Sequence, residues 1–181
     1  MRNFNFINWK NKLKVIESIL CYFNLYENDI IYKSILPQCI IFSLDTIYKI
    51  RKTSSLVIAT LIDHLYKDNY KKENLFKILE SFALHKKFQM RINFIKMCKI
   101  FLDNESIFNE KIFQLLEIIA YKDIIIDVKI AMSKMLIKHM RKRYKFILYN
   151  NDNIHKLIHI LLNDNKNVIN QLFNDIELQD I

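Results

Sequence analysis

The sequence predicts an all-α fold in which antiparallel helix hairpins stack into a right-handed α-α superhelix. The 181 residues contain no glycine and a single proline, so glycine-dependent phosphate loops and tight primed hairpin turns are not expected. Hydrophobic residues make up 51% of the chain, which is enough for a packed core. Apolar residues also recur at helical spacing, in a pattern that itself repeats along the chain.

An apolar residue that opens a helical stripe anchors each repeat. The anchors are Leu13, Ile50, Met90, Val128 and Val168, spaced 37, 40, 38 and 40 residues apart. A basic residue directly follows each of the first four anchors. Further apolar residues continue each stripe, as in Val128, Met132, Met135 and Leu136. These positions share one face of a helix, so each anchor predicts an amphipathic helix.

The first two units differ from the rest. We expect a single helix in residues 1–27, because only twelve residues precede Leu13. Residues 28–69 form a hairpin with Pro37 in the first turn of its leading helix, where proline is favoured. That helix carries the apolar residues Leu36, Ile40 and Leu44. The following helix carries the stripe Ile50, Val57, Ile58 and Leu61.

Three further hairpins follow at residues 70–105, 106–149 and 150–181. Their leading helices carry stripes with identical spacing: Leu75, Ile78, Leu79 and Phe82; Ile112, Leu115, Leu116 and Ile119; and Ile154, Leu157, Ile158 and Leu161. Polar, asparagine-rich segments separate the units and favour helix ends. We expect one array over residues 1–181, because stacked hairpins bury stripes that a lone hairpin exposes. An irregular helical bundle with chance spacing is the alternative.

An acidic residue recurs in the turn before the anchor. Asp45 and Asp123 precede their anchors by five residues and Asp164 by four, while His85 takes this place in the third unit. A turn carboxylate can accept hydrogen bonds from free N–H groups at the start of the next helix and suits the positive end of its dipole.

The order of turn acid, short gap, apolar-basic pair and helical stripe resembles the HEAT repeat. It is present in LPQCIIFSLDTIYKIRKTSSLVIATLIDHL, and the likeness is closer over residues 81–178. That part is similar to the C-terminal repeats of the scaffold (A) subunit of type 2A protein phosphatases and equally to regulatory subunits of phosphatase 4. The resemblance implies an architectural hydrogen-bonded ladder made by Asp45, Arg51, Arg91, Asp123, Lys129 and Asp164. His85 and Ile169 depart from the pattern at the corresponding positions.

The same resemblance implies that the turns inside the hairpins bind a catalytic subunit. The corresponding residues here are Tyr48, Lys49, Lys86, Lys87, Phe88, Tyr121, Lys122 and residues 165–167. Aromatic and basic side chains on such a ridge suit partner binding. Ordinary polar turns are the alternative interpretation.

The formal net charge of +9 suggests an acidic partner such as nucleic acid, although an AT-rich genome would also enrich lysine. One basic patch closes the helix that begins near residue 126, and it consists of Lys138, Arg141, Lys142, Arg143 and Lys145. This patch could bind phosphates or an acidic peptide, or act as a nuclear-import signal. Cations at a helix C-terminus are also favourable for purely structural reasons.

No residue pattern predicts catalysis, a cofactor or a small-molecule ligand. His155 and His159 have metal-ligand spacing, but no third ligand is evident and we expect no metal site. Cys21, Cys39 and Cys98 are expected to be buried free thiols in a reducing compartment. No secretory signal or membrane span is expected.

The sequence therefore predicts a non-enzymatic scaffold that binds a protein partner, by resemblance a type 2A-like phosphatase catalytic subunit. We expect it in the cytoplasm, with the nucleus as the alternative. A basic RNA- or ribosome-associated helical protein is the alternative function.

Overall fold

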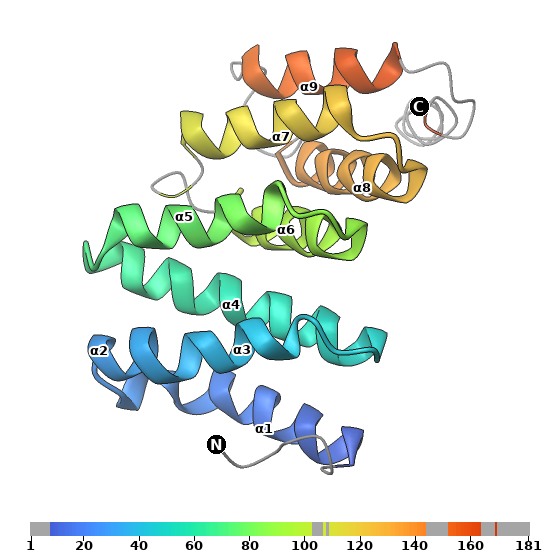
Figure 1. Cartoon of the computed structure of the whole chain (residues 1–181). Coiled ribbons are helices and arrows are strands. Elements are labelled where there is room, and N and C mark those ends of the chain that lie inside the picture. The colour runs from blue at the N-terminus through green and yellow to red at the C-terminus, as the bar shows by residue number, and fades with distance from the viewer. Residues whose placement is uncertain (1–7, 103–106, 108, 144–151, 164–168, 170–181) are drawn as a thin grey trace. The chain divides into compact units, whose positions relative to one another are not determined.

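The computed structural model describes residues 8–102, 107, 109–143, 152–163 and 169, without the side chains of 139–143 and 152–153 (Figure 1). The described residues form helices and the turns that join them, and no strand occurs among them, which confirms the all-α prediction. The chain divides into two compact units, Met1–Ile78 (unit 1) and Leu79–Ile181 (unit 2). A single continuous array over residues 1–181 stays a prediction.

Unit 1 begins with α1 (Trp9–Tyr22), which a short 3₁₀ turn, η2 (Phe23–Leu25), extends. The Asn8 side chain accepts a hydrogen bond from the Lys10 N–H at 3.1 Å. This bond satisfies one of the free donors of the first turn, which explains why α1 starts there.

The next helix changes its hydrogen-bonding pattern along its length. It comprises α2 (Asn28–Ile30), the π-helical η3 (Ile31–Ile35) and α3 (Leu36–Phe42). Pro37 lies in the first turn of α3 and has no N–H to donate to the preceding turn. The Leu36 N–H instead reaches the carbonyl of Ile31, a wider π-type bond. The helical segment therefore starts well before Pro37, and the proline is accommodated by a π-bulge.

The core of unit 1 forms where α1 and α3 each pack on α4 (Tyr48–Lys67). The predicted α4 stripe, which consists of Ile50, Val57, Ile58 and Leu61, is fully buried. Leu13 and Ile16 of α1 and Leu36, Cys39 and Phe42 of α3 are buried as well. The prediction that Leu44 belongs to the apolar stripe was wrong. Leu44 lies in the turn after α3 and is exposed, because the helix ends at Phe42.

The link between α4 and α5 (Lys72–Ala83) uses left-handed backbone at Asn69 (φ 57°) and Lys71 (φ 47°). Asparagine tolerates this geometry, whereas lysine does so at a cost. The Lys71 ammonium lies 4.6 Å from the ring centroid of Tyr32, a favourable cation–π contact. Tyr70 donates a hydrogen bond to Asp29, and this bond raises the pKa of Tyr70 to about 12. These contacts hold the link against η3 and the end of α2.

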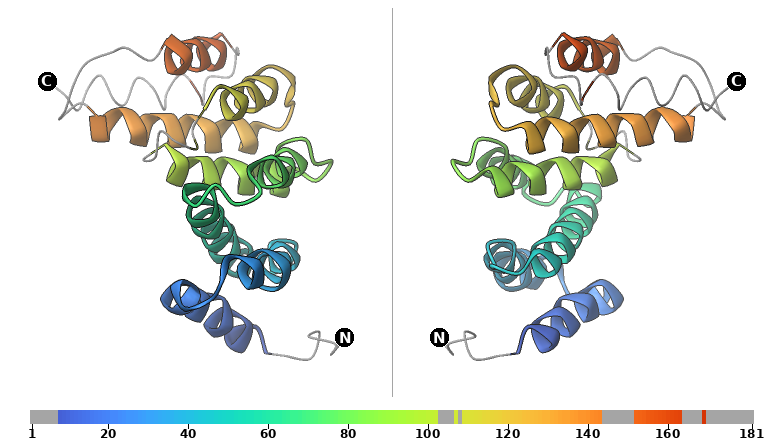
Figure 2. Two further views of the ribbon diagram at one scale, coloured as in Figure 1. Left: turned by 90° about the vertical axis from the view of Figure 1, so that its left-hand side faces the viewer. Right: turned by 90° about the vertical axis from the view of Figure 1, so that its right-hand side faces the viewer.

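Unit 2 continues with α6 (Phe88–Phe101), α7 (Glu110–Lys122), α8 (Ile126–Arg143) and α9 (Asp152–Leu162). Figure 2 shows α6 beside α8 and α7 beside α9. The Asn109 side chain accepts a hydrogen bond from the Ile112 N–H at 3.3 Å and caps α7. The division between the units falls within α5.

The predicted stripes supply much of the unit 2 core. The buried stripe residues of the leading helices are Leu79, Phe82, Ile112, Leu115, Leu116, Ile119, Ile154, Leu157 and Leu161. On α6 and α8 the predicted stripe residues are buried too, and they are Met90, Phe94, Met97, Cys98, Val128, Met132, Met135 and Leu136. Ile158 is only half-buried. No described helix combines the length and apolar character needed to cross a membrane.

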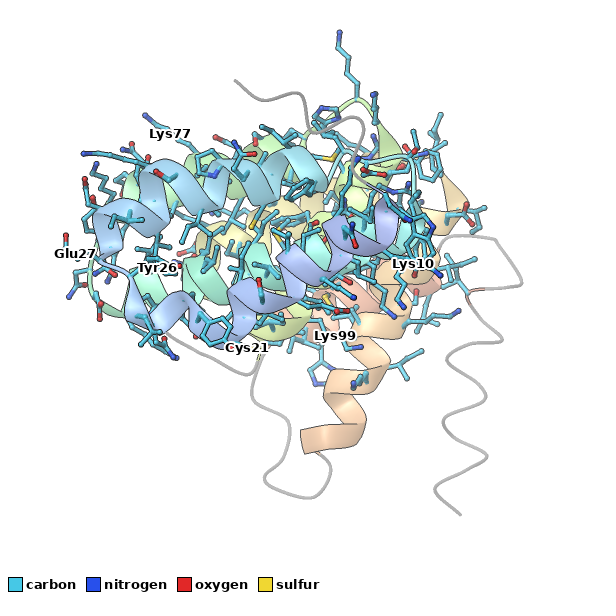
Figure 3. The ribbon with its side chains drawn as sticks, turned by 90° about the horizontal axis from the view of Figure 1, so that it is seen from below. Lys10, Cys21, Tyr26, Glu27, Lys77 and Lys99 are labelled. Atoms are coloured by element: carbon cyan, nitrogen blue, oxygen red, sulfur yellow. The ribbon has the colours of Figure 1, made fainter. Side chains whose placement is uncertain are left out.

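The three cysteines differ in exposure. Burial raises the pKa of the Cys39 thiol to about 12 and raises that of Cys98. Cys21 is exposed, so the prediction of a buried thiol was wrong there. In Figure 3 Cys21 lies on α1, between Lys10 at one end and Tyr26 and Glu27 beyond the other. The helix side that carries Cys21 does not pack on α4, and apolar neighbours in sequence did not indicate this.

Candidate functional site

The candidate functional residues lie in the turns inside the hairpins, at residues 43–47 in unit 1 and at residues 84–87 and 123–125 in unit 2. In each turn a side chain accepts a hydrogen bond from the backbone N–H two residues further on. Asp45 accepts from Ile47 at 2.9 Å, and Asp123 accepts from Ile125 at 3.0 Å. A carboxylate in this place stabilises the approach to the next helix.

His85 makes the same bond with an imidazole nitrogen. Its Nδ1 accepts from the Lys87 N–H at 3.0 Å, so the neutral ring carries its proton on Nε2. The histidine at position 85, where the repeat pattern has an aspartate, therefore preserves the side-chain hydrogen bond that shapes the turn.

An arginine from the following helix fixes two of these turns. Arg51 Nη1 donates to the carbonyls of Asp45 and Thr46, at 2.9 and 2.6 Å. Arg91 Nη1 donates to the carbonyls of His85 and Lys86, at 2.7 and 3.0 Å. Each guanidinium thus satisfies backbone acceptors that a turn would otherwise leave to solvent.

In unit 2, Arg91 also joins two turns to each other. Its Nε and Nη2 donate to the two carboxylate oxygens of Asp123, with Nη2 to Oδ1 at 3.0 Å. The side chains are 17% and 2% exposed, respectively. This two-point geometry is the strongest form of arginine–carboxylate contact, so turns 84–87 and 123–125 are held at a fixed separation.

In unit 1, the cation that contacts the turn acid is Lys12. Its Nζ lies 3.0 Å from Asp45 Oδ2, whereas Lys14, the basic residue after the Leu13 anchor, is exposed. Lys12 was not among the residues predicted for the ladder. The sequence separation of the two pairs could have indicated Lys12, because Lys12 and Asp45 are 33 residues apart and Arg91 and Asp123 are 32 residues apart.

Opposing effects set the ionisation of Asp45. Burial disfavours the charged carboxylate, but the hydrogen bond from Ile47 and the ion pair with Lys12 together outweigh it, so the pKa of Asp45 lies below its ordinary value. The carboxylate is therefore charged at neutral pH.

The remaining ladder residues are Lys129, Asp164 and Arg51. Lys129 is buried in α8, and Asp164 lies outside the described residues. Arg51 contacts its own turn and also lies over the Tyr48 ring, 5.9 Å from the centroid.

Most of the predicted partner-binding residues are exposed. Tyr48 and Tyr121 are 59% and 62% exposed, and Phe88 is half-buried. The exposed lysines among them are Lys49, Lys86, Lys87 and Lys122. Three exposed aliphatic residues in the same turns were not predicted from the sequence, and they are Leu44, Leu84 and Ile124. Residues 165–167 lie outside the described structure.

The basic patch is described only in part. Lys138 is exposed on α8. Arg141, Lys142 and Arg143 belong to α8, but their side chains lie outside the described residues, as does the whole of Lys145.

His155 and His159 are exposed on α9, and His159 Nδ1 lies 3.0 Å from the Asn163 side-chain nitrogen. Among the described residues, no three His, Cys, Asp or Glu side chains group as metal ligands would.

Comparisons of the chain with protein-family models, curated proteins and solved structures found no match. The fold and the site define an all-α protein whose hairpin turns are fixed by side-chain hydrogen bonds and carry exposed apolar and basic residues.

Proposed function

We propose that the protein is a non-enzymatic helical-repeat scaffold that binds a protein partner through the turns inside its hairpins. The observation that carries this proposal is the contrast between a fixed backbone and exposed apolar side chains. Asp45, His85 and Asp123 hold the turn backbones, while Tyr48, Tyr121 and Ile124 project into solvent. Large apolar groups on a rigid support lose little entropy on binding.

The proposed architecture is a HEAT-like stack that forms a right-handed superhelix. Two features of unit 2 support it. The second helices of two hairpins, α6 and α8, pack side by side, and the leading helices α7 and α9 do so as well. Hairpins whose corresponding helices pack on each other in this way can be extended by further hairpins into a curved array.

The proposed partner, on the sequence resemblance, is the catalytic subunit of a type 2A-like Ser/Thr phosphatase, with this chain as a regulatory subunit. The turn surface would position that subunit and would take no part in chemistry. Exposed tyrosines flanked by lysines are residue types that contribute strongly at protein interfaces when they become buried.

Affinity capture from a lysate, followed by mass spectrometry, tests the proposal. We expect the wild-type chain to retain a phosphatase catalytic subunit and the variant Tyr48→Ala/Tyr121→Ala to lose it. The control is Tyr22→Ala, because Tyr22 is 57% exposed on α1 and lies outside the turns. Equal capture by wild type and both variants would contradict a role for the turns. Absence of any phosphatase from the wild-type sample would contradict the partner assignment.

RNA binding is the second candidate function, and the basic end of α8 favours it. Lys138, Arg141, Lys142 and Arg143 fall within two turns of one helix. Binding through several phosphates should weaken steeply as salt rises, whereas docking on a protein should change far less. Changing Arg141, Lys142 and Arg143 to alanine should abolish RNA retention if this function is correct and should leave phosphatase capture intact if the scaffold proposal is correct.

A further inference from the structure

Two turns of unit 2 form one surface, here named the unit 2 turn surface. Its exposed residues are Leu84, Lys86, Lys87, Tyr121, Lys122 and Ile124. Ile124 is 83% exposed, an unusual position for an isoleucine. Arg91 bonds to the backbone of one turn and the carboxylate of the other, so these residues belong to one fixed patch. Figure 1 shows both turns at the same end of their hairpins.

The charges on this surface are predominantly positive. Lys86, Lys87 and Lys122 are exposed, while the carboxylate of Asp123 is buried and neutralised by Arg91. Nearby, Glu117 is paired with Lys156 at 2.7 Å. Asp127 is an exposed carboxylate in the first turn of α8. The patch therefore combines apolar side chains with a cationic rim.

We propose that the unit 2 turn surface binds an acidic peptide segment that carries large apolar side chains. Its Asp and Glu residues would pair with Lys86, Lys87 and Lys122, and its apolar side chains would cover Ile124, Leu84 and Tyr121. Charge complementarity steers such a partner and fixes its register, while burial of the apolar residues supplies the affinity. This inference rests on the proposed scaffold function and specifies the chemistry of the partner.

The apolar residues favour a peptide over RNA on this surface. Single-stranded nucleic acids gain affinity by stacking bases on aromatic rings. Leu84 and Ile124 are aliphatic and cannot stack, so phosphates bound to the lysines would leave both side chains in water. An acidic and apolar segment satisfies both halves of the patch.

Fluorescence anisotropy with labelled synthetic peptides tests the inference. One probe contains Asp, Glu, Leu and Phe, and a second has serine in place of every Leu and Phe at the same charge. A third has lysine in place of every acid, and a fourth is a labelled oligouridylate. We expect the first probe to bind the full chain at least about ten-fold more tightly than each of the other three, a difference that corresponds to about 1.4 kcal/mol.

Substitutions then locate the binding site. We expect Ile124→Ser and Lys122→Glu each to weaken the first probe by about ten-fold or more, which is the scale of an interface residue that matters. Leu25→Ser and Lys77→Glu are matched controls, because Leu25 is 79% exposed on unit 1 and Lys77 is exposed on α5. All four changes are at exposed sites, and far-ultraviolet circular dichroism verifies folding.

Three outcomes would overturn the inference: no binding of the first probe, equal binding of the serine probe, or binding that Ile124→Ser and Lys122→Glu leave unchanged. If the lysate capture still depends on Tyr48 and Tyr121, the scaffold proposal survives and only the assigned partner chemistry fails. Preferential binding of the oligouridylate would also overturn the inference and would support the RNA function.

Discussion

His85 shows, at the residue scale, how a turn can keep its structure while it changes residue type. Aspartate and histidine differ in charge and shape. Nevertheless, Asp45, Asp123 and His85 each place an acceptor atom within 3.0 Å of the backbone nitrogen two residues further on. The turn requires an acceptor at that point, and it does not require a negative charge. This explains why the histidine does not interrupt the repeated backbone geometry.

The acceptor role of His85 can be measured by substitution. We expect His85→Ala to lower the free energy of unfolding by about 1 kcal/mol, because the Lys87 N–H loses its intramolecular partner. His85→Asn keeps a side-chain acceptor and should retain most of that stability. Urea unfolding followed by circular dichroism gives both values. Equal losses in the two variants would show that the hydrogen bond is not what stabilises this turn.

At the scale of elements, an ion pair connects two helices in each unit. The cation lies on one helix, and the acid lies in the turn inside the following hairpin. Lys12 of α1 contacts Asp45 in the turn before α4, and Arg91 of α6 contacts Asp123 in the turn before α8. Each pair lies beside a helix–helix packing interface, α1 with α4 or α6 with α8. The ion pairs therefore fix the register of helices that apolar packing alone would hold less specifically.

Arg91 should be the most sensitive charged residue of unit 2. Arg91→Ala leaves the buried Asp123 carboxylate without its cation, and we expect a loss of about 3 kcal/mol in the free energy of unfolding. Arg91→Lys keeps the charge but loses the planar two-point geometry, so it should recover only part of the loss.

Urea unfolding of these variants, completed by Asp123→Ala and the double variant in a mutant cycle, isolates the coupling between the two residues. A loss below about 0.5 kcal/mol for Arg91→Ala would mean that the pair behaves as an ordinary surface contact.

The Lys12–Asp45 pair should make unit 1 sensitive to acid. Because folding lowers the pKa of Asp45 below its ordinary value of 3.8, the native state keeps this charge to lower pH than the unfolded chain does. The resulting stabilisation is complete above the ordinary pKa and is lost as the pH falls through the folded pKa.

Urea unfolding between about pH 2 and pH 6, the range over which carboxyl groups titrate, measures this effect. Wild-type stability should fall across the acid limb, and Lys12→Met should reduce that fall. Lys14→Met is the matched control, because Lys14 is exposed and lies two residues away on α1. An identical pH dependence in wild type and Lys12→Met would exclude the ion pair as its source.

At the scale of the whole molecule, the proposed single array predicts an elongated particle. A compact globular chain of 181 residues has a radius of gyration of about 16 Å. Hairpins stacked in sequence order extend along one axis, so we expect a clearly larger value from small-angle X-ray scattering of the monomer. A radius of gyration of about 16 Å would contradict the array and favour a helical bundle.

Much of the helical structure could be predicted because helix formation is local. The apolar stripes at Ile112, Leu115 and Leu116 follow the helical period, and the absence of glycine restricts the chain to few alternatives. The turn acceptors Asp45, His85 and Asp123 could also be placed, since each bonds to a backbone group two residues away. The tyrosines and lysines of the candidate site could be placed as well, because they lie in or beside these turns.

The sequence by itself determined the all-α class, most of the stripe residues and the position of the turns. Tertiary structure alone decided that Lys12 and not Lys14 meets Asp45, and that Cys21, Leu44 and Ile124 are exposed. The physical reason is that hydrogen bonding along a helix depends on residues a few positions apart. The partner of a charge, and the side of a helix that becomes covered, depend on elements more than thirty residues away.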